Sequence, residues 1–423
     1  MKTFFEKLRL LFSDETLRKR VLFVFGALIL FRLLAAVPVP GISVGSLTSF
    51  LETNQFLGLL NIFSGGGLAS LSIVMLGVGP YITATIIMQL LTMVFPRLKE
   101  MYHEEGEAGR KKFSQYSRML SVPLAILQGL GLLALLASSN VLLPLEGFHK
   151  VVTLIVITAG SLLLMWIGEL VNEFGIGNGT SIIIFSGIVA GLPAAIGQSL
   201  FSFTTSQLPL YIAFIAVAII IVAGVVLVTE AERPIPVTYA KRVRGARMYG
   251  GMSTYLPLRL NQAGVIPIIF ALSILLFPQM ITNLLANSTN SIVQAISGFA
   301  TGILENQLVY GILYFFLVFV FTYFYTAITF DPHATSENLQ KSGAFIPGTR
   351  PGASTTEYLS QVVTRLTTFG ALFLGIIAVL PIIMQSLTGI ATLAIGGTGL
   401  LIVVSVVIDL MKQINAQLSI REY

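Results

Sequence analysis

The sequence predicts an all-α, polytopic membrane protein with ten transmembrane helices, and three observations support this prediction. Of its 423 residues, 55% are hydrophobic and only 10% are charged, whereas an average soluble domain has roughly 25% charged residues. The apolar residues gather in continuous runs of about 20, the length that a helix needs to cross a bilayer. Lys and Arg residues lie in alternate loops between these runs, as the positive-inside rule expects.

The composition also argues against several other classes of protein. Because a bilayer offers no water to the backbone, only helices and closed barrels can cross it. The apolar runs are continuous rather than alternating, which argues against an outer-membrane barrel. The chain has no cysteine, so it has no disulfide, thiolate metal site or thiol nucleophile. We interpret the net charge of +6 through the position of each charge relative to the membrane, and not as a nucleic-acid signature.

A short cytoplasmic segment, residues 1–20, is expected before the first span. Aromatic and leucine residues recur there at helical spacing opposite charged ones, a pattern typical of a helix that lies in the membrane interface. The apolar run Val21 to Val37 then resembles a signal peptide. Its length, its internal Arg32 and the many later spans favour a retained first helix.

The positive-inside rule tests the count of ten helices. All but two of the 25 Lys and Arg residues fall on one side of the membrane, the exceptions being Lys150 and the intrahelical Arg32. A wrong count would mix the two sides, so the pattern predicts ten spans with both termini in the cytoplasm. The later spans are expected at Ile73 to Val94, Ser117 to Leu136, Val151 to Leu170, Ser181 to Gly197, Leu210 to Val228, Asn261 to Leu284, Leu308 to Phe330, Leu366 to Leu387 and Gly397 to Met411.

Three connecting segments are too long to serve only as links. Two of them, about residues 230–258 and 331–364, are polar, cytoplasmic and contain Gly and Pro, as functional loops often do. On the opposite side, the segment Gly41 to Ser72 contains a moderately apolar stretch followed by Gly65, Gly66 and Gly67. It is too short and too broken by glycine to span, so we expect it to fold back into the protein at membrane depth.

The sequence offers no catalytic constellation. Its three histidines lie in predicted loops, and the predicted spans carry few ionisable residues, namely Arg32, Glu169 and Asp409. An ion-coupled transporter or an intramembrane protease would more often place carboxylates or paired catalytic groups in mid-membrane. The pattern therefore argues against an enzyme, and we expect no metal or other cofactor.

Several patterns allow both an ordinary and a functional interpretation. The loop arginines 242, 244 and 247 fit topology determinants, contacts to anionic lipid, or docking to an acidic protein or to RNA phosphates. Isoleucine pairs at positions 82/86 and 184/188 usually face lipid or a neighbour, yet an apolar ring at a constriction would block ions by dewetting. Glycine and proline in helices 2 and 7 fit packing and kinks, or a seam that opens.

Seven motifs resemble those of the SecY family, the central subunit of the bacterial translocon, and they occur in order along essentially the whole chain. They are Phe63–Gly67 (FSGGG), Gly79–Leu91 (GPYITATIIMQLL), Gly106–Lys112 (GEAGRKK), Gly177–Phe185 (GNGTSIIIF), Ala263–Pro267 (AGVIP), Pro347–Gly352 (PGTRPG) and Gly396–Ile402 (GGTGLLI).

The resemblance implies two pseudo-symmetric five-helix halves around an hourglass pore. The halves are residues 21–200 and 201–412, followed by a cytoplasmic tail, 413–423. A re-entrant plug half-helix is implied at Asn61, Ile62, Phe63, Ser64, Gly65, Gly66, Gly67, Leu68, Ala69, Ser70, Leu71 and Ser72. The implied pore ring consists of Ile82, Ile86, Ile184, Ile188, Ile269 and Ile402.

The resemblance also implies a lateral gate and docking sites. The gate lies between helices 2 and 3 and helices 7 and 8. Its matching positions are Thr85, Gln89, Gln128 and Val265. The implied contacts for the SecA motor and the translating ribosome are Arg242, Arg244, Arg247 and Arg350. Further implied partners are the small membrane subunits SecE and SecG, signal peptides with their preproteins, and membrane lipids.

The function implied is a protein-conducting channel in the cytoplasmic membrane. It would translocate unfolded secretory polypeptides and release transmembrane segments sideways into lipid. The sequence has no phosphate-binding loop motif, so ATP would be used by a partner. A small-solute secondary transporter and a purely structural membrane scaffold are the alternatives.

Overall fold

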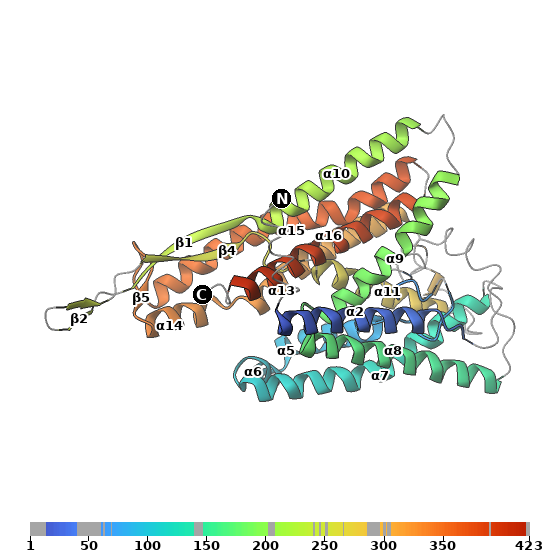
Figure 1. Cartoon of the computed structure of the whole chain (residues 1–423), viewed down its shortest axis with the longest axis horizontal. Helices are drawn as coiled ribbons and strands as arrows, with labels where there is room; N and C mark the ends of the chain where they lie inside the picture. Colours follow the sequence, from blue (N-terminus) through green and yellow to red (C-terminus); the bar gives the residue numbers. More distant parts are fainter. Residues whose placement is uncertain are drawn as a thin grey trace. The chain divides into compact units, whose positions relative to one another are not determined.

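The computed structural model describes residues 14–39, 61, 64–68, 70–138, 147–201, 208–239, 242–244, 247–249, 253–264, 266–285, 297–298, 302, 306–388 and 391–419. These residues are mostly helical (Figure 1). The predicted interfacial segment before residue 14 and the end of the predicted tail lie outside the described residues.

Each of the ten predicted spans coincides with a helix. Six of these helices, α7, α8, α10, α13, α15 and α16, are long and apolar enough to cross a membrane, and a bent pair, α5 with the short helix after it, would be a seventh. Helices α9 and α11 contain shorter apolar stretches. The bounds are α2 (Glu15–Ala35), α5 (Gly79–Val94), α7 (Gly106–Ser138), α8 (Gly147–Phe174), α9 (Gly179–Phe201), α10 (Leu208–Glu230), α11 (Ile266–Leu285), α13 (Gln307–Thr329), α15 (Ala353–Thr388) and α16 (Ala391–Ser419).

Several helices extend well beyond their predicted ends. Helix α2 begins at Glu15 rather than at Val21, because the Asp14 carboxylate caps it by accepting hydrogen bonds from the backbone N–H groups of Thr16 and Leu17, at 2.8 and 3.1 Å. Helices α7 and α15 likewise start 11 and 13 residues earlier than predicted. Hydropathy detects only the part of a helix that is apolar, so polar turns outside that part were missed.

Two predicted spans begin too early. Residues 73–78 form turns, and α5 starts only at Gly79. Similarly, α11 starts at Ile266 rather than at Asn261. In both cases a glycine in the left-handed region, Gly77 at φ 58° or Gly264 at φ 62°, interrupts the helical path just before the start.

A sharp bend follows α5. The next helix, α6 (Pro96–His103), turns away by 116°, and its start is set by Pro96, which cannot donate a backbone hydrogen bond. Buried Met88, Met101 and Phe113 pack α5, α6 and α7 together around this bend. Helix α6 lies between the spans predicted at Ile73 to Val94 and at Ser117 to Leu136, where the sequence predicted a loop, so this prediction is corrected.

The chain divides into two compact units. Unit 1 comprises Met1–Phe214, Leu272–Tyr310 and Pro381–Tyr423, and unit 2 comprises Ile215–Ala271 and Gly311–Leu380. These borders differ from those of the implied halves, so the pseudo-symmetric halves stay a prediction.

Unit 1 is a helical assembly in which α7 packs against α5 and α8, α2 packs against α8 and α9, and α9 packs against α16 (Figure 1). One of its hydrophobic cores joins the segment before α5 to α7 and α8. Because that segment supplies core residues, its fold depends on the helices around it. The core residues are Val39, Leu68, Leu71, Met75, Leu76, Ala125, Leu132, Leu133, Leu135, Leu136 and Ile157.

Unit 2 contains a small antiparallel sheet in strand order β4-β1-β5. Its long strands are β1 (Glu232–Tyr239) and β4 (Ser253–Arg259), and the two-residue β5 (Ala344–Phe345) pairs only with the end of β1. Helix α14 (Pro332–Lys341) contacts β5, and β2 (Arg242–Arg244) and β3 (Arg247–Tyr249) form a separate hairpin.

The two predicted cytoplasmic loops therefore share one folded domain. They had been predicted as loops, but Ile235, Val237, Leu258 and Ile346 form one buried core with the start of α15. Two prolines, Pro234 and Pro236, lie within β1. Both are in the part of β1 that pairs with β4 alone, because β5 pairs only with Thr238 and Tyr239. The prolines therefore lie where β1 is an edge strand, a position in which proline is tolerated.

Helix α10 exposes a continuous apolar surface. Ile215, Ile219, Ile220 and Leu227 are between 57% and 71% exposed. A soluble protein rarely leaves so many adjacent large apolar side chains uncovered, whereas lipid solvates them well. The exposure supports the predicted membrane location of this helix.

The tight contact between Gly160 of α8 and the backbone of Ile73 gives a prediction. A methyl group added at Gly160 would lie 2.0 Å from the Ile73 carbonyl oxygen, so Gly160→Ala should destabilise the protein by about 1–3 kcal/mol through overpacking. Denaturant unfolding in detergent micelles measures this change. Gly191→Ala is the matched control, because nothing lies within 4 Å of the added methyl group. Equal unfolding midpoints for the two variants would contradict the contact.

Candidate functional site

The described residues of 64–68 and 70–78, here called the glycine segment, have irregular backbone yet lie inside unit 1. Ser64, Leu68, Leu71, Ser72 and Val74 are all 0% exposed. Irregular backbone at membrane depth is tolerated only where protein or a water-filled cavity satisfies its polar groups. For the described residues among 64–72, the burial agrees with the prediction that Gly41 to Ser72 folds back into the protein, and its depth in the membrane stays a prediction.

The predicted plug half-helix does not continue through these residues. Asn61 is helical, whereas Ile62, Phe63 and Ala69 lie outside the described residues, and residues 64–68 and 70–71 form turns. Gly65 and Gly66 adopt φ of 65° and 85°, a left-handed conformation that ends a right-handed helix. The correction concerns the conformation, since the location of a plug within 61–72 stays a prediction.

Hydrogen bonds attach the glycine segment to the end of α2. The Ser70 hydroxyl donates to the carbonyl oxygen of Ala35 at 2.8 Å. The Val39 amide donates to the carbonyl oxygen of Leu71 at 2.8 Å, and the Ile73 amide donates to the carbonyl oxygen of Val37 at 3.0 Å. On the α8 side, the Ser161 hydroxyl donates to the carbonyl of Gly77 at 2.8 Å.

Arg32 connects the same segment to α9. One guanidinium nitrogen of Arg32, Nη1, donates to the carbonyl oxygen of Gly65 at 3.1 Å, and the other, Nη2, donates to the carbonyl oxygen of Ser186. The guanidinium carbon lies 4.9 Å from the ring centroid of Phe31. Nearby, a methyl group added at Gly187 would lie 2.0 Å from the Cα of Gly65, so the two backbones touch.

The structure shows one contact between α9 and α16, two helices that carry predicted ring residues, and the ring itself stays a prediction. Ile188 of α9 packs against Gly399 of α16, where an added methyl group would lie 3.0 Å from its side chain, and Ile402 is one turn further along α16. Ile269 belongs to unit 2 and is also buried. The remaining predicted members, all in unit 1 and all buried, are Ile82, Ile86 and Ile184.

The predicted gate residues behave differently from one another. Buried Gln128 of α7 donates from Nε2 to the hydroxyl of Thr83 on α5 at 3.3 Å, a partner that the sequence analysis missed. Thr85 donates to the carbonyl of Tyr81 at 2.9 Å within its own helix. The Oε1 atom of Gln89 is buried and accepts no hydrogen bond within the described part of the chain. Val265 lies outside the described residues.

Three of the predicted docking arginines lie on the β2–β3 hairpin. Arg244 pairs with Arg247 in the register of the two strands, and Arg242 pairs with Tyr249. The backbone therefore gathers three arginines, which the sequence places in one loop, onto a single two-stranded element.

Arg350 is exposed on a turn of unit 2, residues 347–352, between β5 and α15. The Thr355 hydroxyl donates to the carbonyl of Arg350 at 2.9 Å, and the Ser336 hydroxyl of α14 donates to the carbonyl of Gly352 at 2.9 Å. Gly348 and Gly352 take φ of 88° and 101°, which favours glycine there. The motif thus fixes the backbone and leaves the guanidinium free to meet a partner.

The supporting residues Ser336 and Thr355 were missed by sequence reasoning. Thr355 could have been found from the sequence, because it is a hydroxyl residue three positions after Gly352, the second glycine of the motif. Ser336 could not, because it lies 16 residues from Gly352.

On the same helix as Ser336, the hydrogen bond and charge of Lys341 hold the pKa of the Glu337 carboxyl below its ordinary value.

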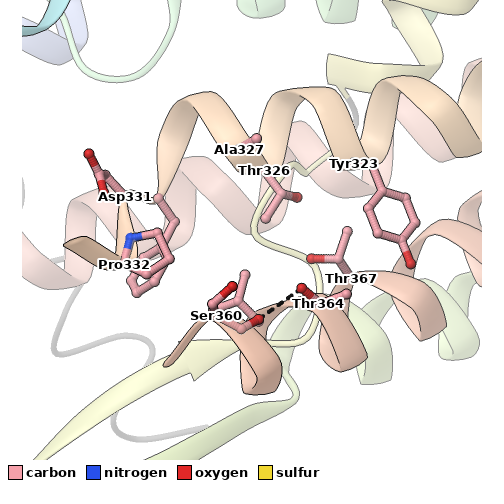
Figure 2. A pocket seen from close by; sticks show the side chains of 10 residues that line it. Tyr323, Thr326, Ala327, Asp331, Pro332, Ser360, Thr364 and Thr367 are labelled. Carbon is pink, nitrogen blue, oxygen red and sulfur yellow. Dashed lines mark hydrogen bonds between the residues drawn. The ribbon is translucent and has the colours of Figure 1, made fainter. Parts of the chain in front are cut away.

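A cavity of about 250 Å³ lies where the end of α13 meets the start of α15 (Figure 2). Two of its hydroxyl groups bond within their own helices: the Thr364 hydroxyl donates to the carbonyl oxygen of Ser360, and the Thr326 hydroxyl donates to that of Thr322, both at 2.8 Å. The Asp331 carboxylate caps α14. None of the predicted site residues lines the cavity.

The described part of the chain contains no cluster of three or more His, Cys, Asp or Glu side chains that could hold a metal ion.

Comparisons with known proteins point in one direction. A family model described as SecY matches residues 72–411. The protein translocase subunit SecY of Mycobacterium tuberculosis (strain ATCC 25618 / H37Rv) is 44% identical over 96% of both chains. The protein of the same name from Thermus thermophilus is 43% identical over 96% of this chain and 94% of its own.

Solved structures share the fold at lower identity. A structure described as a protein conducting channel has a TM-score of 0.64 at 19% identity and covers 95% of this chain and 93% of its own. A second structure, from work on the plug domain of the SecY protein, has a TM-score of 0.66 at 20% identity with the same coverage. Sec61 in a canine ribosome-channel complex has a TM-score of 0.62 at 18% identity, covering 95% of this chain and 93% of its own.

The hydrogen bond between Gln128 and Thr83 gives a prediction for unit 1. A buried neutral hydrogen bond contributes about 0.5–1.5 kcal/mol, so Gln128→Leu and Thr83→Val should couple by that amount. A double-mutant cycle of unfolding free energies in detergent measures the coupling. Thr85→Val in place of Thr83→Val is the control, because Thr85 bonds within α5. Strict additivity for the 83/128 pair would show that the bond does not contribute.

Proposed function

The chain belongs to the SecY family, and from this premise we propose that it forms a protein-conducting channel of the cytoplasmic membrane. The channel translocates unfolded secretory polypeptides and releases transmembrane segments laterally into lipid. Its relatives in Mycobacterium and Thermus carry the name of a protein translocase subunit, and they match over nearly their whole length.

The observation that carries the proposal is the buried glycine segment. It is irregular, lies inside unit 1 and is attached by single hydrogen bonds rather than by a regular helix. A segment held in this way can leave without unfolding a spanning helix. We propose that it belongs to the plug, Asn61 to Ser72, which closes the channel at rest.

The isoleucines supply the second part of the seal. We propose a constriction ring of Ile82, Ile86, Ile184, Ile188, Ile269 and Ile402. A narrow passage lined only by aliphatic side chains excludes ions by dewetting, because it offers an ion no group to replace its hydration shell. The same side chains yield to a passing polypeptide. Support comes from the burial of all six residues and from the contact of Ile188 with α16.

Opening requires a seam, for which we propose Thr85, Gln89, Gln128 and Val265 as gate residues. A signal peptide gains about 0.8 kcal/mol for each CH₂ group that leaves water for lipid, and this gain shifts a closed seam toward an open one. The buried Oε1 of Gln89, which accepts no hydrogen bond from the described residues, supports this role, because a buried polar atom that lacks a partner makes the closed state easier to leave. Apolar segments then move sideways into lipid.

We propose that the cytoplasmic domain of unit 2 receives the driving partners. The SecA motor and the translating ribosome would contact Arg242, Arg244, Arg247 and Arg350, since Arg makes bidentate contacts to carboxylates and phosphates. ATP is used by the motor, and the chain itself is not an enzyme. SecE and SecG are the proposed membrane partners. The Lys and Arg distribution supports the proposal that both termini are cytoplasmic.

Deleting Asn61 to Ser72 tests the channel directly. In planar bilayers, the chain with its small membrane partner should be silent, and the deletion should conduct ions because the aqueous path loses its plug. The control is the intact chain, whose motor-driven transport must be active in the same vesicles. Silence of both forms, together with absent transport, would favour a solute transporter or a scaffold.

Charge reversal at Arg350 tests the docking proposal. Arg350→Glu should lower motor-driven transport about tenfold, because it places like charge against the partner at a fixed turn. Arg233→Glu is the matched control, since Arg233 is also exposed on the same domain. Motor binding and preprotein transport would be measured in vesicles. Equal transport by both variants would remove Arg350 from the interface.

A further inference from the structure

The charged side chain of Arg32 is unused by the mechanism above, although it lies in the last turn of an apolar helix. Within the part of the chain that the structure describes, no carboxylate forms an ion pair with it. Its two guanidinium nitrogens donate instead to the backbone carbonyls of Gly65 and Ser186. An ionisable residue in a membrane helix, satisfied only by irregular backbone and a helix carbonyl, indicates a functional role.

We propose that Arg32 is the latch that keeps the glycine segment in its closed position. The inference rests on the proposed function, because it assumes that this segment closes a channel. The planar fork of the guanidinium allows one side chain to hold two carbonyl groups on separate elements at once.

The position of Ser186 connects the latch to the proposed ring. Ser186 lies on α9 between Ile184 and Ile188, and Arg32 is the side chain that joins α9 to the glycine segment through hydrogen bonds. The other described hydrogen bonds that leave the glycine segment go to residue 61, to the end of α2 and the residues just after it, to α8, or to the start of α5. A displacement of α9 that widens the proposed ring would therefore separate Arg32 from the Ser186 carbonyl. This loss would open the latch and free the glycine segment from α9.

The close fit of Gly65 makes the latch sensitive to position. A methyl group at Gly187 would lie 2.0 Å from the Cα of Gly65, and one at Gly65 would lie 2.4 Å from the ring of Phe31. The guanidinium carbon of Arg32 lies 4.9 Å from the centroid of that same ring. The carbonyl of Gly65 thus reaches the guanidinium only when the turn is seated between α2 and α9.

The first test replaces Arg32 without changing charge. Lysine is a compact point charge that cannot present the fork, so Arg32→Lys should raise the resting ion current of the reconstituted complex toward that of the 61–72 deletion. Arg20→Lys is the matched control on the same helix, because Arg20 is exposed. Motor-driven preprotein transport of Arg32→Lys should persist, since the latch is needed only for closing.

The second test measures access to the glycine segment. The chain has no cysteine, so Ser64→Cys introduces a single thiol at a fully buried position. A membrane-impermeant maleimide should label it about tenfold faster when Arg32→Lys is also present, because loss of a charge-assisted hydrogen bond makes the open position more populated. Arg20→Lys should leave the labelling rate unchanged.

The possible results separate the latch from the channel. If the 61–72 deletion conducts but Arg32→Lys neither conducts nor speeds labelling, the latch is wrong and the channel stands. If the deletion is also silent, the proposed function itself fails. If Arg32→Lys does not fold, Gly187→Ala provides a second variant, because it displaces the same turn and keeps Arg32. A Gly187→Ala complex without resting ion current, and without faster labelling of Ser64→Cys, would overturn the latch.

Discussion

The need to satisfy backbone polar groups away from water is the constraint on which this structure depends. Regular helices meet it within themselves, but the glycine segment cannot. The Ser70 hydroxyl donates to the segment's own Gly67 carbonyl, and the Ser161 hydroxyl and the Arg32 guanidinium donate to its Gly77 and Gly65 carbonyls. Backbone groups of the residues just after α2 bond to further groups of the segment. Each of these contacts is a separate bond, so the segment is held firmly at rest while it remains separable from the helices.

The sequence was informative where one physical property dominates. Apolar runs and the placement of Lys and Arg located a helix at each of ten expected positions, because membrane solvation acts on every residue of a span. The ends of the helices were less predictable. Asp14 extends α2 by a local cap, and Gly77 delays α5 by its positive φ, both of which are short-range effects that hydropathy does not contain.

The contacts of the candidate site residues could not be predicted from the sequence. Ile82, Ile86 and Ile402, which the motif resemblance assigns to a pore ring, are buried, and their place in such a ring stays a prediction. Gln128 bonds to Thr83, which is 45 residues away in the sequence, and Arg32 bonds to Ser186, which is 154 residues away. Only the packing of the helices reveals such distant partners. The small domain of unit 2 was missed for a similar reason, since its core combines residues that precede α13 in the sequence with residues that follow it.

The length of α15 has a mechanical consequence. Its 36 residues form a rod of about 54 Å at 1.5 Å per residue, although the hydrocarbon layer is only about 30 Å thick. The helix begins at Ala353, directly after the turn that carries Arg350, and its internal proline, Pro381, comes 28 residues later. A force applied at that turn would therefore be carried along several continuous helical turns before it reaches a residue that can kink the helix.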